Sequence, residues 1–293
     1  MEKKILTSPE WKDYELIDSG NFEKLERFGD YTLIRPEPQA LWDRKLPESK
    51  WRSLAHARYV AKTSTSGNWE KYKEIRSPWN ISFTQKDLKV SFSLKFTAFK
   101  HVGVFPEQAA HWVYLYDFLK KSGIKQPKVL NLFAYTGGAS LAAKAAGADV
   151  IHLDSVKQVV NWSRENMELS GLKDIRWVVE DAAKFAQREA KRGNKYNAII
   201  MDPPSYGLGP NGERWKLEDQ LNDLMKNVFS VLDPEKHCFI MNTYSLNLSS
   251  LVLKNITESI LKEPYIDDFG ELAAESKTGQ ILPLGSFLRL KKL

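Results

Sequence analysis

The sequence predicts an α/β protein with a doubly wound, mostly parallel sheet, an antiparallel hairpin at one edge of that sheet, and a smaller β-rich domain before it. Period-two alternation of apolar and polar residues dominates residues 1–105 and indicates hairpins. From residue 106, short apolar runs alternate with segments of helical periodicity, which is the pattern of βαβ units. Residues 269–293 contain two apolar stretches without a helix between them, which indicates the antiparallel pair. We therefore expect two domains, 1–105 and 106–293.

The first domain is expected to contain two pairs of strands. Residues 14–20 and 31–38 alternate on either side of a short polar stretch, and residues 79–84 and 88–99 alternate on either side of a Lys-Asp turn. The segment 46–72 between the two pairs is polar and basic with weak periodicity, so we expect an irregular excursion there.

The second domain is expected to alternate strands with helices. Strands open the segments 128–138, 149–154, 175–193, 196–205 and 237–245. Helices occupy 107–123, 139–147, 156–171, the second half of 175–193, and 218–232. Because parallel strands that are buried on both sides read as continuous apolar runs, helices are expected on both faces of this sheet.

The composition limits the class of protein. Of 293 residues, 42% are hydrophobic and 27% are charged, which is a globular composition and excludes a disordered chain. The single cysteine, Cys238, excludes a disulfide scaffold and suits a reducing compartment. No stretch approaches the roughly 20 apolar residues of a membrane span, and the first residues lack the apolar core of a secretory signal. We expect a soluble, cytoplasmic protein with no membrane partner.

Basic and aromatic residues gather in the first domain. Residues 1–105 hold 19 Lys and Arg against 14 Asp and Glu, together with 16 of the 34 aromatic residues. Residues 106–293 hold 24 and 23 residues of the two charge classes. Since cations neutralise phosphates and aromatic rings stack on bases, the first domain is a candidate surface for RNA. The alternative is that the excess charge is modest and most of these aromatic residues form the core.

Residues with functional chemistry follow the expected strands at their carboxyl ends, where open α/β sheets bind ligands. Thr136, Gly137 and Gly138 form a tight turn into a helix, whose free N–H groups suit an anionic group. Asp154 closes the second strand, where an acid can accept hydrogen bonds from both ribose hydroxyls of a nucleoside cofactor. Asp181 follows the third strand and can accept a hydrogen bond from an adenine amine. The ordered set predicts one crevice for a nucleoside cofactor.

Two cofactors fit such a crevice, a dinucleotide and S-adenosylmethionine. The loop at 133–139 reads FAYTGGA and lacks the G-x-G-x-x-G fingerprint of dinucleotide sites. After the fourth strand, DPPSYG at 202–207 forms a rigid, extended turn, which we expect to point carbonyl oxygens and a carboxylate at a planar substrate. The nearby Arg214, Trp215 and Lys216 are candidates to bind a phosphate and a base. The alternative is that they form a solvated loop.

These motifs resemble the class I S-adenosylmethionine-dependent methyltransferases. The segment NLFAYTGGASLAA, the acids Asp154 and Asp181, and DPPSYG carry the resemblance. The segment GVFPEQ at 103–108 and the tail ELAAESKTGQILPLGSFLRL are similar to the branch that contains the bacterial 23S ribosomal RNA large-subunit methyltransferases. The resemblance covers residues 79–293 and implies S-adenosylmethionine as the cofactor and a base of ribosomal RNA as the acceptor.

The resemblance also implies roles for individual residues. The residues implied to bind the cofactor are Gln108, Phe133, Ala134, Tyr135, Thr136, Gly137, Asp154, Ser155, Val156, Asp181, Ala182 and Asp202. The residues implied to act on the acceptor are Asp202, Pro203, Pro204 and Tyr206. Asp202 would orient the acceptor or take its proton, and Tyr206 would stack on the base. The five histidines show no metal-ligand spacing, so no metal is expected.

One position departs from the members of the branch that methylate cytosine at C5. Those members carry a cysteine after the fifth strand, and its thiolate attacks C6 of the ring. This chain has Asn242-Thr243-Tyr244-Ser245 there, and Cys238 lies within an apolar run, where we expect a buried, inert thiol. Transfer to a nitrogen or an oxygen needs no covalent adduct, because either atom already has a lone pair, and a nitrogen acceptor is favoured over cytosine C5. The alternatives are a methyltransferase for a small molecule or a protein, and a non-catalytic RNA-binding protein with the same fold.

Overall fold

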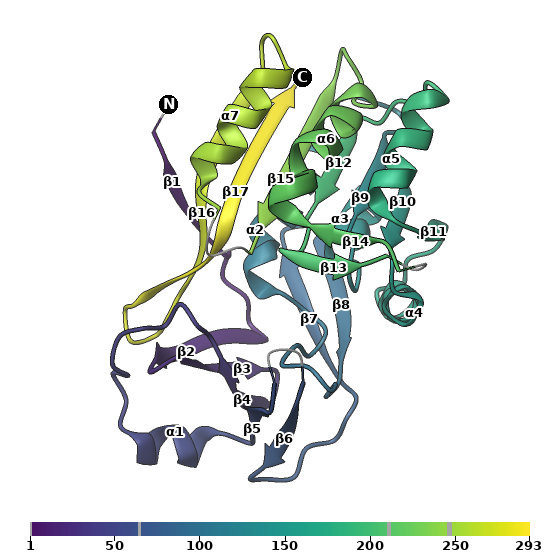
Figure 1. Cartoon of the computed structure of the whole chain (residues 1–293). Coiled ribbons are helices and arrows are strands. Elements are labelled where there is room, and N and C mark those ends of the chain that lie inside the picture. The colour runs from purple at the N-terminus through teal and green to yellow at the C-terminus, as the bar shows by residue number, and fades with distance from the viewer. Residues whose placement is uncertain (1, 64–65, 210–211, 245–247) are drawn as a thin grey trace. The chain divides into compact units, whose positions relative to one another are not determined.

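The computed structural model describes residues 2–63, 66–209, 212–244 and 248–293 (Figure 1). The chain forms two compact units. The α/β unit comprises Met1–Leu6, Ala110–Leu272 and Gly285–Leu293, and the β-rich unit comprises Thr7–Ala109 and Ala273–Leu284. Each unit is therefore assembled from segments that lie far apart in the sequence.

The α/β unit is built on an eight-stranded sheet with the order β1-β16-β17-β15-β12-β9-β10-β11. Its strands are β1 (Lys4–Thr7), β9 (Lys128–Leu132), β10 (Asp149–Asp154), β11 (Ile175–Val179), β12 (Ala198–Met201), β15 (His237–Thr243), β16 (Ile266–Glu275) and β17 (Ile281–Lys292). The pairs from β15 to β11 are parallel, and β17 runs antiparallel to β15. The strand order reverses at β9, because the chain first moves outward to β10 and β11 and then returns to β12 and β15. The predicted doubly wound, mostly parallel sheet is confirmed.

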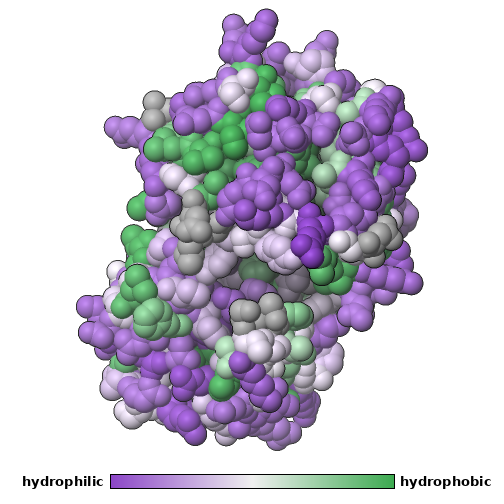
Figure 2. Space-filling model, in the orientation of Figure 1, coloured by the Kyte–Doolittle hydropathy of each residue, from purple (hydrophilic) through white to green (hydrophobic). Residues whose placement is uncertain are grey.

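Six helices among the described residues accompany this sheet. They are α2 (Ala109–Lys121), α3 (Gly138–Ala145), α4 (Lys157–Leu169), α5 (Ala182–Lys191), α6 (Leu217–Ser230) and α7 (Ser250–Ile260). Figure 1 shows α5, α6 and α7 in front of the strands, and Phe185 and Leu224 from this layer share a buried core with Met201 and Phe239 of the sheet. Figure 2 shows a mostly hydrophilic surface, with a hydrophobic area at the upper left where Figure 1 places α7. Within the described part of the chain, no helix has both the length and the apolar character needed to cross a bilayer.

Several elements of the α/β unit were not predicted. β1 lies outside the hairpin of β16 and β17, so that β1, not the hairpin, forms this edge of the sheet. β13 (Tyr206–Leu208) and β14 (Arg214–Lys216) form a short antiparallel hairpin after β12, and α7 follows β15. The three short strands have only three or four residues each, which is too few for an alternating pattern to be recognised.

The β-rich unit contains a five-stranded sheet of order β2-β3-β4-β5-β6 and a separate hairpin of β7 and β8. Its elements are β2 (Tyr14–Gly20), β3 (Glu23–Phe28), β4 (Tyr31–Pro36), α1 (Glu48–Leu54), β5 (Ala57–Ala61), β6 (Gly67–Lys71), β7 (Trp79–Gln85), β8 (Leu88–Leu94) and the 3-10 helix η1 (Pro106–Gln108). The predicted hairpin around residue 86 is confirmed as β7 and β8. The prediction of an irregular segment at 46–72 is wrong, because α1, β5 and β6 lie there. Trp51 orders the segment: its ring is fully buried, and its indole N–H donates to Asp18 over 2.8 Å.

β3 was not predicted, because its sequence EKLERF carries four charged residues. Three of them, Glu23, Lys24 and Glu26, are nevertheless buried. Arg35 of β4 donates hydrogen bonds to Glu26 over 2.8 and 2.9 Å, and the Tyr14 hydroxyl donates another over 2.9 Å. Burial acts to raise the pKa of Glu26, but Arg35 and then Lys24 outweigh it, and the pKa is lowered from its usual value. Charged residues are normally expected to be exposed, so the sequence pattern does not indicate a buried strand here.

The N-terminus of α3 lies very close to α2. A Cβ atom added to Gly138, the first residue of α3, would lie 2.3 Å from the ring of Trp112 in α2. Trp112 is itself buried, so its ring has little space into which to move. The glycine therefore allows α2 and α3 to approach, and this approach sets the position of the loop before α3.

We expect Gly138→Ala to lower the free energy of unfolding by about 2 kcal/mol, because the added methyl group overpacks a buried contact. Chemical denaturation followed by circular dichroism measures the change. In a Trp112→Leu background the same substitution should cost clearly less, since the obstructing ring is gone. An equal cost in both backgrounds would contradict the contact as the cause.

Candidate functional site

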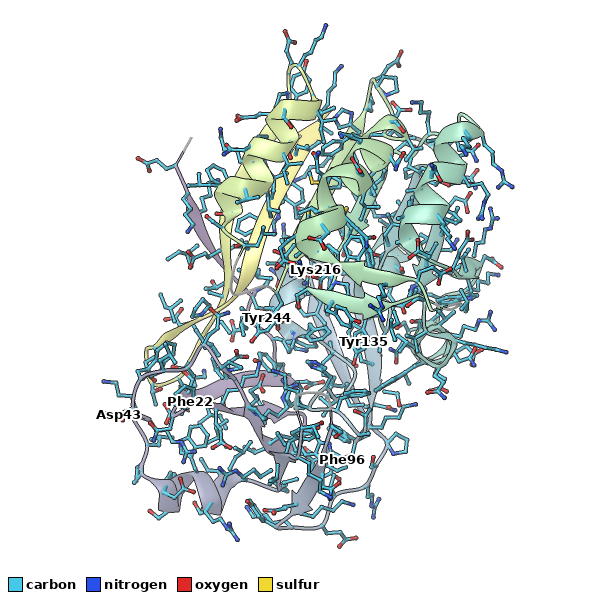
Figure 3. All side chains as sticks on the ribbon, in the orientation of Figure 1. Phe22, Asp43, Phe96, Tyr135, Lys216 and Tyr244 are labelled. Carbon is cyan, nitrogen blue, oxygen red and sulfur yellow. The ribbon has the colours of Figure 1, made fainter. Side chains whose placement is uncertain are left out.

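A pocket opens at the carboxyl ends of the parallel strands of the α/β unit. Its lining residues are Phe133, Leu153, Asp154, Ser155, Glu180, Asp181, Ala182, Pro204, Gly207, Leu208, Gly209 and Trp215. They come from the ends of β9, β10, β11 and β12 or from the segments after them, which include the short strands β13 and β14. The four strand ends that the sequence singled out therefore converge on one site. Figure 3 marks Tyr135, Lys216 and Tyr244 along this edge of the unit.

The loop between β9 and α3 has an unusual backbone. Phe133, Tyr135 and Gly137 all have positive φ angles, of 54°, 48° and 95°. Only the glycine adopts this conformation without cost, and each of the two aromatic residues stores about 1–3 kcal/mol of strain. Backbone strain of this kind persists where surrounding contacts enforce it, and it concentrates at ligand sites.

Asp154 is the residue that enforces the shape of this loop. It ends β10, and its carboxylate accepts a hydrogen bond from the Tyr135 N–H and another from the Val156 N–H, each over 2.9 Å. Burial raises the pKa of Asp154, and the backbone N–H groups of Val156 and Tyr135 act against that rise by stabilising the ionised form. A carboxylate has about four acceptor positions, so this one can hold the loop and also accept hydrogen bonds from a ligand.

A buried network of uncharged polar side chains supports the same loop from below. His152 contacts the Ser140 hydroxyl over 3.0 Å and the Ser163 hydroxyl over 3.2 Å. Ser163 donates to the Tyr135 carbonyl over 2.7 Å, and Asn166 donates to the Thr136 carbonyl over 2.9 Å. Burial, with a smaller effect of Arg164, lowers the pKa of His152 to about 3, so the imidazole is neutral at physiological pH.

The acids after β11 have structural partners as well as a place in the pocket. Asp181 caps α5, because its carboxylate accepts a hydrogen bond from the Lys184 N–H over 2.9 Å. Glu180 accepts two hydrogen bonds from the Arg188 guanidinium, which holds its side chain against α5. Both acids line the pocket, so α5 positions them.

The turn at 202–204 differs from the sequence prediction. The Pro204 carbonyl, expected to face a substrate, accepts a hydrogen bond from the Trp215 indole over 2.5 Å. Trp215 is buried and packs against the ring of Phe133, with the centroids 5.3 Å apart. Strand alternation in β14 turns Trp215 inward and leaves Arg214 and Lys216 exposed, so the predicted alternative of a solvated loop is wrong for Trp215, and its contact with a base stays a prediction. Asp202 accepts a hydrogen bond from Asn242 over 3.0 Å.

Five of the twelve predicted cofactor residues line the pocket. Those that line it are Phe133, Asp154, Ser155, Asp181 and Ala182, together with Pro204 from the predicted acceptor set. Those that lie in the adjoining loops, or at the start of β13, without lining it are Ala134, Tyr135, Thr136, Gly137, Val156, Asp202, Pro203 and Tyr206. Gln108 ends η1 in the β-rich unit, and its role stays a prediction.

Sequence reasoning missed the contribution of the β13–β14 hairpin to this pocket. Gly207, Leu208 and Gly209 line it, and Ser155 donates to the Leu208 carbonyl over 3.5 Å. The Y-G-L and R-W-K triplets do alternate in exposure, so a period-two pattern was present. It was too short to separate from a loop.

Cys238 lies near the start of β15, whereas the pocket lies beyond the carboxyl ends of the strands. The thiol is fully buried, and burial raises its pKa far above the usual value. The predicted burial of the thiol is confirmed, and its inertness stays a prediction. Ser245, the last residue of the 242–245 motif, lies outside the described residues.

Comparison with known proteins places the chain among methyltransferases. Residues 84–232 match the family model described as S-adenosylmethionine-dependent methyltransferase. The ribosomal RNA large subunit methyltransferase K/L of Shewanella frigidimarina is 27% identical over 195 residues, which are 63% of this chain and 27% of the relative. The ribosomal RNA large subunit methyltransferase I of Aeromonas salmonicida is 33% identical over 168 residues, 55% of this chain and 42% of the relative. The chain thus spans less than half the length of these relatives.

Solved structures share the whole fold. The SAM-dependent methyltransferase from Agrobacterium tumefaciens has a TM-score of 0.92 and 38% identity, over 100% of this chain and 95% of that chain. A putative methyltransferase solved in complex with SAH has a TM-score of 0.74 and 17% identity, over 97% of this chain and 76% of that chain. The first similarity extends to sequence, and the second shows the fold.

We expect Asp154→Asn to weaken S-adenosylmethionine binding by about 10- to 100-fold, because an amide cannot accept the hydrogen bonds of both backbone N–H groups and a ribose. Isothermal titration calorimetry measures the affinity. Since the pKa of Asp154 is raised, wild-type affinity should fall as the pH drops toward that pKa, whereas the affinity of the variant should not change there. A thermal melt of the Asp154 variant, compared with that of wild type, is the control for fold. Wild-type affinity in the Asp154 variant would contradict the site.

We expect the free energy of unfolding to fall as the pH drops below about 6.5, because the unfolded chain protonates His152 and the folded chain does not. In His152→Gln this dependence should be shallower by up to about 1.4 kcal/mol per pH unit between pH 6 and pH 4. Urea denaturation across that range gives the slopes. Identical slopes in the two proteins would refute a buried neutral imidazole.

Proposed function

The chain belongs to the S-adenosylmethionine-dependent methyltransferases, and we propose that it methylates a base of large-subunit ribosomal RNA. The observation that carries the proposal is the convergence of Asp154, Asp181 and the Asp202 turn around one edge of the sheet. The names of the two curated relatives, both large-subunit ribosomal RNA methyltransferases, support RNA as the acceptor.

The residues of the pocket suit an adenosyl cofactor. When bound, S-adenosylmethionine supplies a sulfonium methyl group that a nucleophile in line with the C–S bond can displace. Asp154 would accept hydrogen bonds from the ribose hydroxyls, and Asp181 from the adenine amine. Phe133 and Trp215 would form an apolar wall beside the cofactor, since their rings pack together at the pocket.

A nitrogen of the base is the acceptor that the site favours. Asn242, Thr243 and Tyr244 occupy the segment where C5-specific members carry their cysteine, and the thiol of Cys238 is buried. A ring or amino nitrogen has a lone pair that attacks the methyl group directly. Asp202 would orient this nitrogen or take its proton, while the exposed Tyr206 would stack on the base.

The β-rich unit is proposed to hold the RNA. Seven of its 16 aromatic residues, including Trp11, Trp51 and Phe83, are buried, and most of the others are half-buried, so stacking cannot rest on their number. Its cations differ, because residues such as Lys71, Arg76 and Lys89 are exposed. An exposed set of cations neutralises phosphates and makes binding dependent on salt.

Two other functions remain alternatives to this proposal. A methyltransferase for a small molecule or a protein would show little dependence on salt, and a non-catalytic RNA-binding protein would bind RNA without transferring methyl groups. Deletion of residues 1–105 would not separate these cases, because β1 of the α/β sheet lies in that segment. Point substitutions of exposed cations are the better tool.

We expect cells that lack the gene to lose one N-methylated nucleoside from their 23S ribosomal RNA, measured by mass spectrometry of nucleosides. Purified protein with labelled S-adenosylmethionine should restore that nucleoside on the RNA, with a rate that falls steeply as salt rises. Cys238→Ser should keep this rate within about twofold, because the buried thiol takes no part. An unchanged nucleoside profile would refute ribosomal RNA as the substrate, and complete loss of transfer in a folded Cys238 variant would restore C5 chemistry.

A further inference from the structure

The register of β12 and β15 brings two polar side chains together at the carboxyl end of the sheet. Met201 pairs with Met241 in parallel, so Asp202, the residue after β12, lies beside Asn242, which is still within β15. Both methionines belong to the buried core, and strand alternation turns the residues after them away from it. The Asn242 amide then donates to Oδ1 of Asp202 over 3.0 Å.

The chemistry of the partner fixes the orientation of the Asn242 amide. An ionised carboxylate only accepts hydrogen bonds, so the NH₂ group of Asn242 must face Asp202. The Asn242 side chain is 3% exposed, and its Oδ1 is buried with no hydrogen-bond partner among the residues that the structure describes. An orphaned buried acceptor costs free energy, so an apolar residue would suit this position better if stability alone mattered.

The neighbouring strand leaves space for this amide. A Cβ atom added to Gly285 in β17 would lie 3.2 Å from Oδ1 of Asn242 and 2.7 Å from the Thr243 carbonyl oxygen. A larger residue at 285 would therefore push against the end of β15. The absence of a side chain there keeps the amide in place, and the amide in turn holds Asp202.

We propose that Asn242 is a positioning residue for the Asp202 carboxylate. Its N–H group fixes one carboxylate oxygen and favours the ionised form, which is the form that accepts a hydrogen bond or a proton from the acceptor nitrogen. This inference rests on the proposed function, in which Asp202 orients the acceptor nitrogen or takes its proton. It adds a residue on a different strand that sets the geometry and the charge of that group.

Titration of the Asp202 carboxyl group tests the proposal without any substrate. Protein labelled with ¹³C at the aspartate carboxyl carbons is titrated by NMR, and Asp202→Asn identifies the resonance. Asn242→Leu should raise the pKa of Asp202 by about one unit, because the donor is lost. Asn242→Asp should give a coupled pair of carboxylates with one apparent pKa raised further. Thr243→Val is the matched control, since Thr243 is the next residue, is equally buried and has no partner for its hydroxyl among the described residues.

The same variants are then compared in methyl transfer from labelled S-adenosylmethionine to deproteinised 23S RNA. The acid limb of the kcat/KM profile should move to higher pH in Asn242→Leu and further in Asn242→Asp, with S-adenosylmethionine affinity within about twofold of wild type. At neutral pH the leucine variant should lose about 10- to 100-fold in kcat/KM. The control should match wild type in both measurements.

Two results would overturn the inference. One is an Asp202 pKa that is the same in wild type, Asn242→Leu and Asn242→Asp, with thermal melts showing that the variants fold. The other is a loss of transfer that is equal at every pH, which is what a role in holding the end of β15 would give. If wild-type protein transfers nothing to the RNA, the proposed function fails, while the carboxyl titration still decides the role of Asn242.

Discussion

The hydrogen bond between the Tyr135 N–H and the Asp154 carboxylate is the constraint on which the rest of the site depends. Two aromatic residues in the loop after β9 adopt left-handed backbone angles that side chains normally avoid. They keep these angles because β9 and β10 are paired, with Leu132 opposite Leu153, so Asp154 arrives directly beside the loop. The geometry of a ligand site is thus set by the pairing of two neighbouring strands.

Two buried polar networks, one in each unit, are stabilised in different ways. Beneath the loop of the α/β unit, His152 stays neutral and shares hydrogen bonds with hydroxyl groups. In the β-rich unit, Glu26 and Arg35 are both buried and both charged, and each stabilises the ionised form of the other. A neutral network avoids the desolvation of ions, whereas a buried ion pair tolerates it only with well-formed hydrogen bonds. Both networks hold backbone segments in a conformation that the local sequence does not specify by itself.

The turn after β12 is shaped from two sides. On one side the Trp215 indole N–H donates a hydrogen bond to the Pro204 carbonyl. This bond ties the proline turn to the β13–β14 hairpin. On the other side Asn242 holds Asp202. The acid and the prolines are contiguous in sequence, yet their partners come from β14 and β15. The chemistry of the turn is therefore a property of three segments, and substitutions in the hairpin and in β15 are expected to affect it separately.

The sequence by itself determined the order of the parallel strands and of helices α2 to α6 in the α/β unit, the turn at Gly137 and Gly138, and the acids at the strand ends. Each of these rests on local information, because apolar periodicity, glycine conformation and the residue after a strand can all be read within a few positions. Tertiary structure decided what lies between distant segments: the buried charges of β3, the ordering of residues 46–72 around Trp51, the inward turn of Trp215, and the pairing of Asp202 with Asn242. Burial and strand register depend on which segments of the chain come into contact. These contacts cannot be read from the local patterns of one sequence.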